Sequence, residues 1–511
     1  MSSDSLKKRY IFKLSTNFIG FLISLVTAGI VPRALGVNNY GNFNFATTIV
    51  KQILTFLDFK TSTCFYTKLS QRQRESNLLL FYAYYTIAIL ILLVIIISVI
   101  SMTSLKILIF SELSISIIYY AVLYVILFWI LGLLIKVMDA NGATVPLEQM
   151  RIINKIISTV IILSLYFYTK LTLTIYFYYM FGVSLALIIP IIIYIRSRIG
   201  YSIKLFPLLE KGIVVSYIKE FSIYSSPLAL YVILSFISLS FDRWILQISG
   251  GSFQQGLYSF SFTLTNYTFM FISAMFPLFT RELSIFARDN DILGMARLFR
   301  RYVPLLYSLS AYFACFIFVN AEPIVRIFGG VNYLSATTSL KILAILPLIS
   351  TYSMLNGAVV YANGNTKIFL KIALIFTPIG MITTFYLISG KYGGLNLGAN
   401  GLAIKNVIFE FISVIIILYI NSRYLKIKYL RYLLHMIISI IPITIIAYLS
   451  RYFITYIFQT FTNSTNEILI VFFAGLLYST LTMLIVIVFP RLFGLYKNDI
   501  AYLTKKIRVL M

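Results

Sequence analysis

The chain has 511 residues, of which 60% are hydrophobic and only 11% are charged. This composition excludes a soluble fold and indicates an α-helical protein that crosses a membrane many times. The net charge of +26 does not indicate nucleic-acid binding, because the basic residues are confined to alternate loops, as in membrane proteins.

Apolar runs long enough to cross a bilayer follow one another along the whole chain. We predict fourteen helices, at 11–32, 41–63, 78–102, 114–137, 152–169, 171–195, 219–247, 256–280, 302–321, 335–361, 366–389, 399–421, 430–450 and 467–490. Most basic residues outside these runs gather at one set of helix ends, which the positive-inside rule assigns to the cytoplasm. Both termini are therefore expected to be cytoplasmic.

The first half of the chain repeats in the second half. Gly41–Phe45 (GNFNF) recurs as Gly256–Phe260 (GLYSF) at a shift of 215 residues, and Ala140–Thr144 (ANGAT) recurs as Ala362–Thr366 (ANGNT) at a shift of 222. Each match is short, but their order and spacing agree. The sequence therefore predicts a duplicated unit of six helices.

This duplication predicts an all-α polytopic membrane protein with two pseudo-symmetric lobes. We expect an N-terminal lobe at 1–198, a cytoplasmic linker at 199–218, a C-terminal lobe at 219–422, and two extra helices with a basic tail at 423–511. Both lobes begin in the same orientation, so they would be parallel repeats with the substrate path between them.

A line of polar residues runs along the second predicted helix. Asn44, Thr48, Lys51, Thr55 and Asp58 follow at steps of three or four, which places them on one helical face. Lys51 lies near the bilayer centre, where a charge costs at least about 2.5–3.5 kcal/mol unless it faces protein or water. The line is either a structural ion pair buried between helices or the wall of a hydrophilic cavity.

Other predicted helices carry polar residues at matching places. In the eighth helix, the shift of 215 maps the polar line onto uncharged residues, so the cavity should be positive on one side only. Ordinary close helix packing is the alternative reading of the small polar residues. The candidates for the cavity wall are Asn17 and Ser24 in the first helix, Ser235 and Ser238 in the seventh, and Ser259, Thr263 and Asn266 in the eighth.

Further charged residues lie in or near the predicted helices. After Lys51, the candidate cations for binding an anionic substrate are Arg33, Arg243 and Lys405. Acidic residues at such depths are candidates for coupling transport to a proton or sodium gradient. These candidates are Asp58, Glu410, Asp242 and Asp139, with a structural pair to Lys136 as the alternative for Asp139.

Several short motifs resemble those of a known family. Pro32–Gly36 (PRALG) followed by Tyr40-Gly41 looks like the start of bacterial polysaccharide exporters, and Asp242–Leu246 (DRWIL) followed by Gly256–Tyr258 looks like their second-half element. The same order continues in Phe276-Pro277, Phe328-Gly329 with Tyr333, Leu343-Ala344 with Pro347 and Asn356, and Gly394 with Gly398-Ala399 and Gly401. Over nearly its whole length the chain resembles the Wzx-type O-antigen and capsule flippases of the multidrug/oligosaccharidyl-lipid/polysaccharide exporter superfamily.

The resemblance implies a MATE-like, V-shaped pair of lobes that work by alternating access in the bacterial cytoplasmic (inner) membrane. The implied substrate is an undecaprenyl-diphosphate-linked oligosaccharide, the repeat unit of O-antigen or capsule in lipopolysaccharide and polysaccharide biosynthesis. Lys51 fits the place of the central cations that meet the diphosphate in such flippases, whereas Asn266, its counterpart in the second half, carries no charge. Implied partners are a polysaccharide polymerase and chain-length proteins. No cofactor is expected beyond a possible coupling ion.

Two other readings stay open. A small-molecule or cation antiporter of the same superfamily would usually have an acidic cavity, whereas the deepest charge here is a lysine. A membrane-embedded polysaccharide polymerase would be expected to carry a large external loop with catalytic residues, and all external loops here are short. The sequence has no acid–base pair, metal-ligand spacing or nucleophile arrangement typical of an enzyme. We therefore expect a transporter.

Overall fold

The computed structural model describes residues 6–72, 75–201, 209–365, 367–390, 393–461 and 466–495. Residues 202–208 of the predicted linker and the basic tail after residue 495 lie outside this part. Within it the secondary structure is helical throughout, without a strand. The predicted all-α membrane fold is confirmed.

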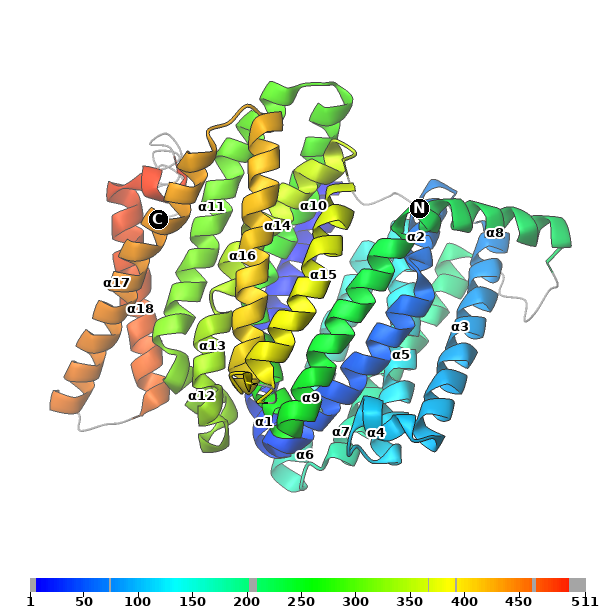
Figure 1. The fold of residues 1–511 in the computed structure, drawn as a ribbon, viewed down its shortest axis with the longest axis horizontal. Helices are drawn as coiled ribbons and strands as arrows, with labels where there is room; N and C mark the ends of the chain where they lie inside the picture. Colours follow the sequence, from blue (N-terminus) through cyan, green and yellow to red (C-terminus); the bar gives the residue numbers. More distant parts are fainter. Residues whose placement is uncertain are drawn as a thin grey trace. The chain divides into compact units, whose positions relative to one another are not determined.

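The helices follow one another with short connections (Figure 1). In chain order they are α1 (Leu6–Asp58), α2 (Thr61–Gln71), α3 (Ser76–Met102), α4 (Leu105–Phe110), α5 (Ile115–Ala140), α6 (Thr144–Tyr168), α7 (Leu173–Tyr194), α8 (Lys211–Ser225), α9 (Ala229–Asn266), α10 (Met270–Arg288), α11 (Ile292–Val319), α12 (Ala321–Gly329), α13 (Thr337–Leu343), α14 (Leu346–Ala362), α15 (Lys367–Ile388), α16 (Gly398–Tyr424), α17 (Tyr429–Phe461) and α18 (Glu467–Val488).

Twelve stretches of the described residues are long and apolar enough to cross a membrane. Two of them, Phe18–Asp58 and Lys211–Phe269, are too long for a single crossing, which takes about 20 residues. Each of these two is interrupted by a glycine with non-helical backbone angles, Gly36 in α1 and Gly251 in α9. Divided at these glycines, the described stretches give fourteen segments, as predicted.

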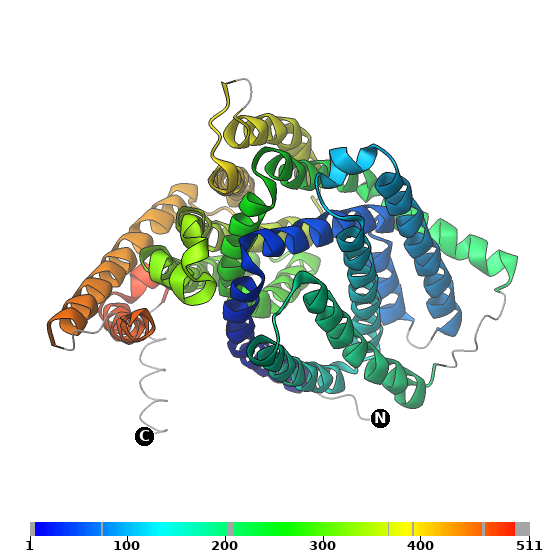
Figure 2. The same cartoon turned by 90° about the horizontal axis from the view of Figure 1, so that it is seen from below.

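The two interruptions repeat at the interval found in the sequence. Gly36 has φ 70° and ψ 168°, and Gly251, which is 215 residues later, has φ 63° and ψ −168°. Residues with a Cβ are strongly disfavoured in this region, so a glycine at each break lets the helix axis change direction. The change of direction in α1 is visible in Figure 2. The duplication therefore extends to the backbone.

The second sequence repeat also has a common geometry. Gly142 follows α5 with φ 76°, and Gly364 follows α14 with φ 73°. In each case the preceding asparagine ends the helix, with Asn141 bonding to Val137 and Asn363 bonding to Val359 through their backbone N–H groups. The shift of 222 thus relates two identical helix ends.

The chain divides into two compact units. The first unit comprises the residues up to Gly256 together with Ala373–Tyr392, and the second comprises Leu257–Ile372 together with the residues from Gly393 onwards. The first unit includes α8 and α9 up to Gly256, in addition to the helices of the predicted N-terminal lobe.

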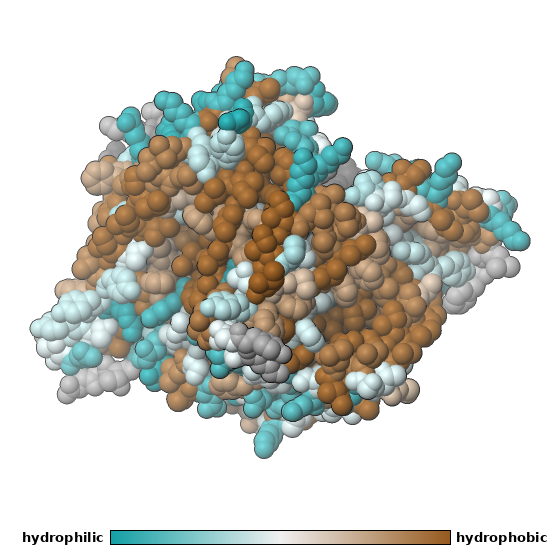
Figure 3. Space-filling view, viewed as in Figure 1, coloured by the Kyte–Doolittle hydropathy of each residue, from teal (hydrophilic) through white to brown (hydrophobic). Residues whose placement is uncertain are grey.

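Aromatic side chains form much of the packing in both units. In the first unit, Phe65 of α2 stacks on Tyr82 of α3 with ring centroids 4.2 Å apart. In the second, Tyr312 of α11 stacks on Tyr478 of α18 with ring centroids 4.8 Å apart. On the face in Figure 3, apolar side chains cover the middle of the helices and polar ones gather at their ends, as expected for membrane-spanning helices.

Candidate functional site

Lys51 lies in the part of α1 that follows the break at Gly36, and its side chain is exposed. Its ammonium nitrogen lies 4.8 Å from the centre of the Phe128 ring in α5. No carboxylate of the described residues lies within 4.0 Å of it. The sequence left two interpretations of this charge, a buried ion pair and the wall of a cavity. The described contacts of Lys51 contain no ion pair.

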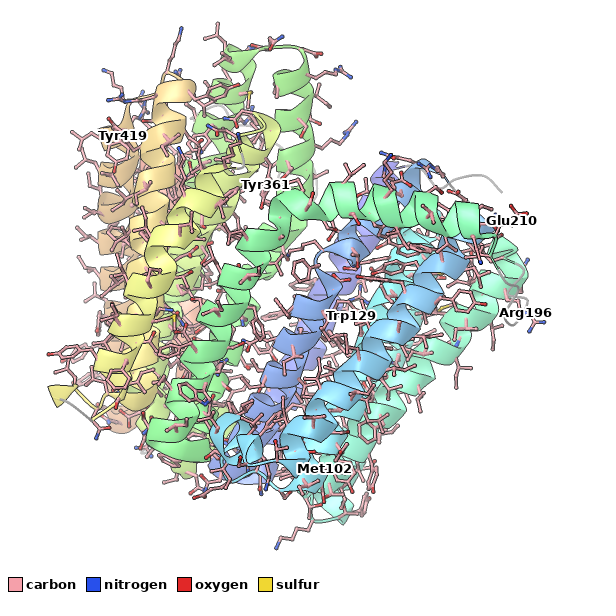
Figure 4. All side chains as sticks on the ribbon, turned by 45° about the vertical axis from the view of Figure 1, so that its right-hand side comes forward. Met102, Trp129, Arg196, Glu210, Tyr361 and Tyr419 are labelled. Atoms are coloured by element: carbon pink, nitrogen blue, oxygen red, sulfur yellow. The ribbon has the colours of Figure 1, made fainter. Side chains whose placement is uncertain are left out.

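The position of Lys51 along the helices can be judged from its aromatic neighbour Phe128. Trp129, next to Phe128 in α5, lies between Met102 at one end of the first unit and Arg196 and Glu210 at the other (Figure 4). Lys51 is therefore far from both ends of the helices. A cation–π contact compensates an ammonium by only about 0.5–2 kcal/mol, less than the cost of a charge at this depth.

The polar residues beside Lys51 keep the same face accessible. Thr55 is exposed, and Asn44 and Thr48 are half-buried. The Asn44 side-chain amide donates to the Tyr40 carbonyl at 2.8 Å, and the Thr55 hydroxyl donates to the Lys51 carbonyl at 2.8 Å. Both bonds stay within α1, and together with Lys51 and Thr48 these side chains form a polar strip along the helix.

The opposite face of the same helix is apolar. Ile49, Ile53, Phe56 and Leu57 line a pocket of about 460 Å³ together with residues of α3, α4, α9 and α15. The only hydroxyl in that lining, on Ser240, donates to Gln52 at 3.0 Å. The second part of α1 is thus amphipathic across its width, with Lys51 directed away from this pocket.

Asp58 ends α1 and is buried, with 3% of its surface exposed. Its carboxylate accepts from the Thr61 hydroxyl at 2.8 Å, the Ser62 N–H at 3.0 Å, the Ser62 hydroxyl at 2.8 Å and the Tyr82 hydroxyl at 3.1 Å. The carboxylate therefore caps the start of α2 and ties it to α3. Its spacing along the polar line suggested an ion-coupling role, and the geometry gives it a structural one.

Lys155 is a cation that the sequence analysis did not select, since it lies near the start of the predicted helix 152–169. The structure places it within α6, eleven residues after Thr144 and thirteen before Tyr168, and half-buried. Its ammonium nitrogen lies against α1, where a Cβ on Gly20 would be only 3.2 Å away. A helix predicted from residue 144 instead of residue 152 would have placed Lys155 inside the membrane span.

The motif around Asp242 and Arg243 joins parts of the first unit. Buried Asp242 accepts a hydrogen bond from the Thr384 hydroxyl of α15 at 2.7 Å. Arg243 donates to the side-chain carbonyl of Gln255 at 3.1 Å, and the Gln255 amide donates back to the Arg243 carbonyl. Since these two residues lie on either side of Gly251, the pair fastens the two parts of α9 together.

The remaining candidates of the first unit occupy helix surfaces. Arg33 is exposed three residues before the break in α1, and the Ser24 hydroxyl donates to the Gly20 carbonyl at 2.8 Å. Asp139 accepts from the Thr144 hydroxyl at 2.9 Å, beside the turn between α5 and α6. Ser235 and Ser238 are half-buried in α9, and the Asn17 side chain lies outside the described residues.

Five candidates lie in the second unit. In the last part of α9, Ser259 is buried, Thr263 is half-buried and Asn266 is exposed. In α16, Lys405 is buried, with its nitrogen 5.6 Å from the Phe409 ring centre, and Glu410 is hydrogen-bonded by Ser353 of α14. The predicted site residues thus divide between the units.

Metal and thiol chemistry find little support in the described residues. They contain no group of three His, Cys, Asp or Glu side chains that could hold a metal ion. Cys64 and Cys315 are both free and buried. Burial raises the pKa of the Cys64 thiol to about 11, so it is protonated and unreactive near neutral pH.

The arrangement of helices is similar to that of solved membrane transporters. An inward-facing multidrug-resistance MATE transporter of the MOP superfamily matches with a TM-score of 0.60 at 14% identity, covering 81% of this chain and 95% of that one. The lipid II flippase MurJ, in an inward closed conformation, matches at 0.58 and 16% identity over 93% of this chain and 98% of that one. A MOP-superfamily transporter from Pyrococcus furiosus, noted for the reverse polarity of its binding pocket, matches at 0.54 and 15% over 83% and 97%.

This chain has the fold of MOP-superfamily transporters. No family model matches the sequence, and no curated protein matches it. The MOP fold accounts for the many membrane spans, and the similar structures are transporters and a flippase. The polar strip around Lys51 thus lies in a chain with this fold.

Proposed function

We propose that the protein is a flippase for undecaprenyl-diphosphate-linked oligosaccharides, the repeat units of O-antigen or capsule, in the bacterial cytoplasmic membrane. The observation that carries the proposal is the exposed ammonium of Lys51, deep in the first unit of a MOP fold and without a described carboxylate partner. A diphosphate carries negative charge that cannot enter hydrocarbon without compensation. Lys51 supplies that compensation halfway along the path.

The residue type suits a moving anion. Lysine carries a compact charge on a flexible stem, so it can follow a phosphate group as the protein changes conformation. The Phe128 ring holds the ammonium in place by a weak contact that a phosphate displaces at little cost. Asn44, Thr48 and Thr55 extend the polar strip, and their hydroxyl and amide groups suit the sugar units.

Two further observations support a lipid-linked substrate over a small cation. The match to the lipid II flippase spans 93% of this chain, against 81% for the MATE transporter. Asp58 and Asp242 are the most buried of the candidate carboxylates in the first unit. Both already accept hydrogen bonds from protein groups. A cation exporter would instead need an acidic group facing its path.

The proposed topology places the end with Arg196 and Glu210 in the cytoplasm, together with both termini, because basic residues gather there. Glu410 in α16 is the acid we assign to coupling with a proton or sodium gradient, since it is half-buried within a membrane span and its only described side-chain partner is Ser353. Transport that continues at the full rate after both gradients are collapsed would contradict this coupling role.

The test is transport by purified protein in liposomes. A fluorescent undecaprenyl-diphosphate oligosaccharide is placed in the membrane, and its movement to the other leaflet is followed with a membrane-impermeant reagent. Lys51→Ala should slow transport at least about tenfold, which corresponds to losing one charge-assisted contact of about 1.4 kcal/mol. Lys51→Arg should keep part of the rate.

Lys170 provides the matched control for charge removal. It is exposed in the connection after α6 and lies outside the polar strip. Lys170→Ala should transport at the wild-type rate and unfold at the wild-type temperature. Equal rates for Lys51→Ala and wild type would contradict the proposed function.

A further inference from the structure

Two pockets of the first unit lie between α3 and α9. The apolar pocket is the one of about 460 Å³ described above, and its lining includes Ile96 of α3 and Phe236 of α9. The hydroxyl pocket, of about 350 Å³, lies between Tyr85 of α3, residues of α8 and Ala229 at the start of α9. Both volumes fall in the range of about 300–1,000 Å³ that ligand pockets have.

The two pockets follow one another along the helices. On α3, Tyr85 of the hydroxyl pocket precedes Ile96 of the apolar pocket by eleven residues, which is about 16 Å of helix. On α9, Ala229 precedes Phe236 by seven residues, or about 10 Å. Both helices therefore place the hydroxyl pocket on the side of α8 and the apolar pocket farther from it.

The end of α1 joins the two pockets. Leu57 lines the apolar pocket, and Phe59, two residues later, lines the hydroxyl pocket. The ring of Phe56 contacts both sides, with its centroid 5.3 Å from that of Phe59 and 4.7 Å from that of Phe236. The pockets are therefore neighbours, and one ligand with a polar and an apolar part can reach both.

The hydroxyl pocket offers hydrogen-bond donors without charge. Ser225 is 7% exposed, and its hydroxyl has no hydrogen-bond partner among the described residues. Burying such a group is costly unless a ligand supplies an acceptor. Among the described residues, no charged side chain lines either pocket. An uncharged acceptor such as an ester carbonyl therefore suits this pocket, whereas a diphosphate does not. The hydroxyl-bearing lining residues are Thr61, Tyr85, Ser222, Ser225 and Ser226.

The apolar pocket offers no free polar side chain. Its one hydroxyl, on Ser240, already donates to Gln52 at 3.0 Å. The indole N–H of Trp244 donates to the Leu108 carbonyl of α4. Water would find few partners here, since a stable buried water needs two to four polar groups. A hydrocarbon chain is the occupant that matches this lining.

The order of the two pockets is that of a bilayer leaflet. Figure 4 shows α8 running from Glu210 across the end of α3 that is opposite Met102. Away from α8, the lining changes from hydroxyl groups to apolar side chains within about 10 Å of α9. A lipid changes in the same direction, from its glycerol esters at the membrane surface to its chains in the membrane interior.

We propose that the two pockets together bind one glycerophospholipid of the surrounding bilayer. The Ser225 hydroxyl donates to an ester carbonyl, one hydrocarbon chain enters the apolar pocket, and the headgroup stays outside both pockets. This site goes beyond the proposed function, because the apolar pocket lies on the face of α1 opposite Lys51. The bound lipid is thus a resident molecule with its own site, separate from the transported one.

Tryptophan fluorescence of the purified full-length protein in detergent tests the site. The chain has two tryptophans, Trp129 and Trp244, and only Trp244 lines the apolar pocket. The probe is phosphatidylglycerol brominated in its chains, because bromine quenches tryptophan at short range. In Trp129→Phe, quenching should saturate as lipid is added and be reversed by unbrominated phosphatidylglycerol. Trp244→Phe, which keeps Trp129, should show no saturable quenching.

A variant of the hydroxyl pocket tests the polar contact. In the Trp129→Phe background, Ser225→Ala should weaken lipid binding about fivefold, the effect of losing one hydrogen bond. Ser216→Ala is the matched control on the same helix. Ser216 is exposed, lies outside both pockets, and donates to the Ile213 carbonyl at 2.8 Å.

A variant of the apolar pocket tests the chain contact. Ile237→Phe narrows this pocket and should weaken lipid binding about tenfold. Leu239→Phe is the matched control, because Leu239 is exposed on the same helix and lines neither pocket. Thermal unfolding of each variant in detergent shows that it is folded before affinities are compared.

Each outcome decides the proposal. Saturable quenching that Ser225→Ala and Ile237→Phe weaken, with both controls unchanged, supports it. Quenching that rises in proportion to added lipid without saturating, or that neither variant changes, would overturn it. A short-chain polyprenyl diphosphate should not displace the brominated lipid, and displacement would assign the pockets to the transported lipid instead. None of these results depends on transport, so the proposed function stands or fails separately.

Discussion

The helices α1 and α9 have the same interrupted backbone and different charges. Gly36 and Gly251 break them at equivalent positions, yet Lys51 of α1 corresponds to uncharged Asn266 at the end of α9. Duplication gave both halves one backbone design, and the charged residue is present in only one of them. The comparison shows that both halves kept the bend, whereas only the first half carries the lysine.

The two helices also pack reciprocally just after their breaks. A Cβ on Gly41 would be 1.8 Å from the Ser252 carbonyl oxygen, and a Cβ on Gly256 would be 2.2 Å from the Val37 carbonyl oxygen. Both pairs are related by the shift of 215 residues. Each helix thus approaches the backbone of the other so closely that only glycine fits, as at other tight membrane-helix crossings.

The strongest way to break this symmetry is to fill the crossing. Gly41→Leu and Gly256→Leu should each prevent a stable fold, because the contacted atoms are backbone and overpacking costs about 1–3 kcal/mol or more even where side chains yield. The measurement is the yield of monodisperse protein in detergent, with its thermal unfolding. Gly182→Leu in α7, where a Cβ meets nothing within 4 Å, is the control.

The difference in charge between the two repeats can be removed by placing a lysine in the second repeat. Ser259→Lys should cost about 3–5 kcal/mol, because the side chain is 3% exposed and a charge there would be buried without a partner. Asn266→Lys, the exact counterpart of Lys51, is exposed and should unfold at nearly the wild-type temperature. Similar unfolding temperatures for the two variants would show that the buried and exposed positions do not differ as described.

Asp58 tests whether the polar line continues to its last residue. Asp58→Ala should lower the free energy of unfolding by about 2–3 kcal/mol, since Thr61, Ser62 and Tyr82 would lose their acceptor in a buried place. Thermal unfolding measures this loss. A variant of unchanged stability that no longer responds to an ion gradient would instead favour the coupling role.

The smallest effect is expected where α8 meets α2, at one end of the first unit. Glu220 of α8 contacts Lys68 of α2 at 2.7 Å and Arg72, the residue directly after α2, at 2.6 Å. These groups are partly exposed, so Glu220→Gln should cost no more than about 1 kcal/mol, and the cost should decrease with added salt. Unfolding temperatures at low and high sodium chloride check both statements, and a loss independent of salt would contradict them.

Hydropathy and spacing predicted much of this molecule. The membrane spans and the exposed face of Lys51 follow from local periodicity, and the repeated glycine breaks follow from motif matches at a constant shift. The predicted helix 152–169 puts Lys155 near its start and leaves out Glu148 and Arg151. In the structure these two residues form an ion pair on one side of α6, so the helix begins eight residues earlier than predicted.

Asp58 shows a second limit of spacing. It has the interval that would place it on the face of Lys51, but α1 ends at this residue and the carboxylate turns to the start of α2. Whether a helix ends depends on the hydrogen bonds offered by the next element, which periodicity does not report. The close contact at Gly41 and Gly256 could likewise not be predicted, because the sequence does not show which residues a glycine will contact.

The paired glycine crossing has a consequence for tracing the ancestry of such chains. Because Gly41 and Gly256 each lie against the other helix, a substitution at either one disturbs a backbone encoded in the other half of the gene. The two codons are therefore expected to persist together while most others drift. They offer a fixed point for aligning distant proteins of this architecture, even at the 14–16% sequence identity between this chain and the similar solved structures.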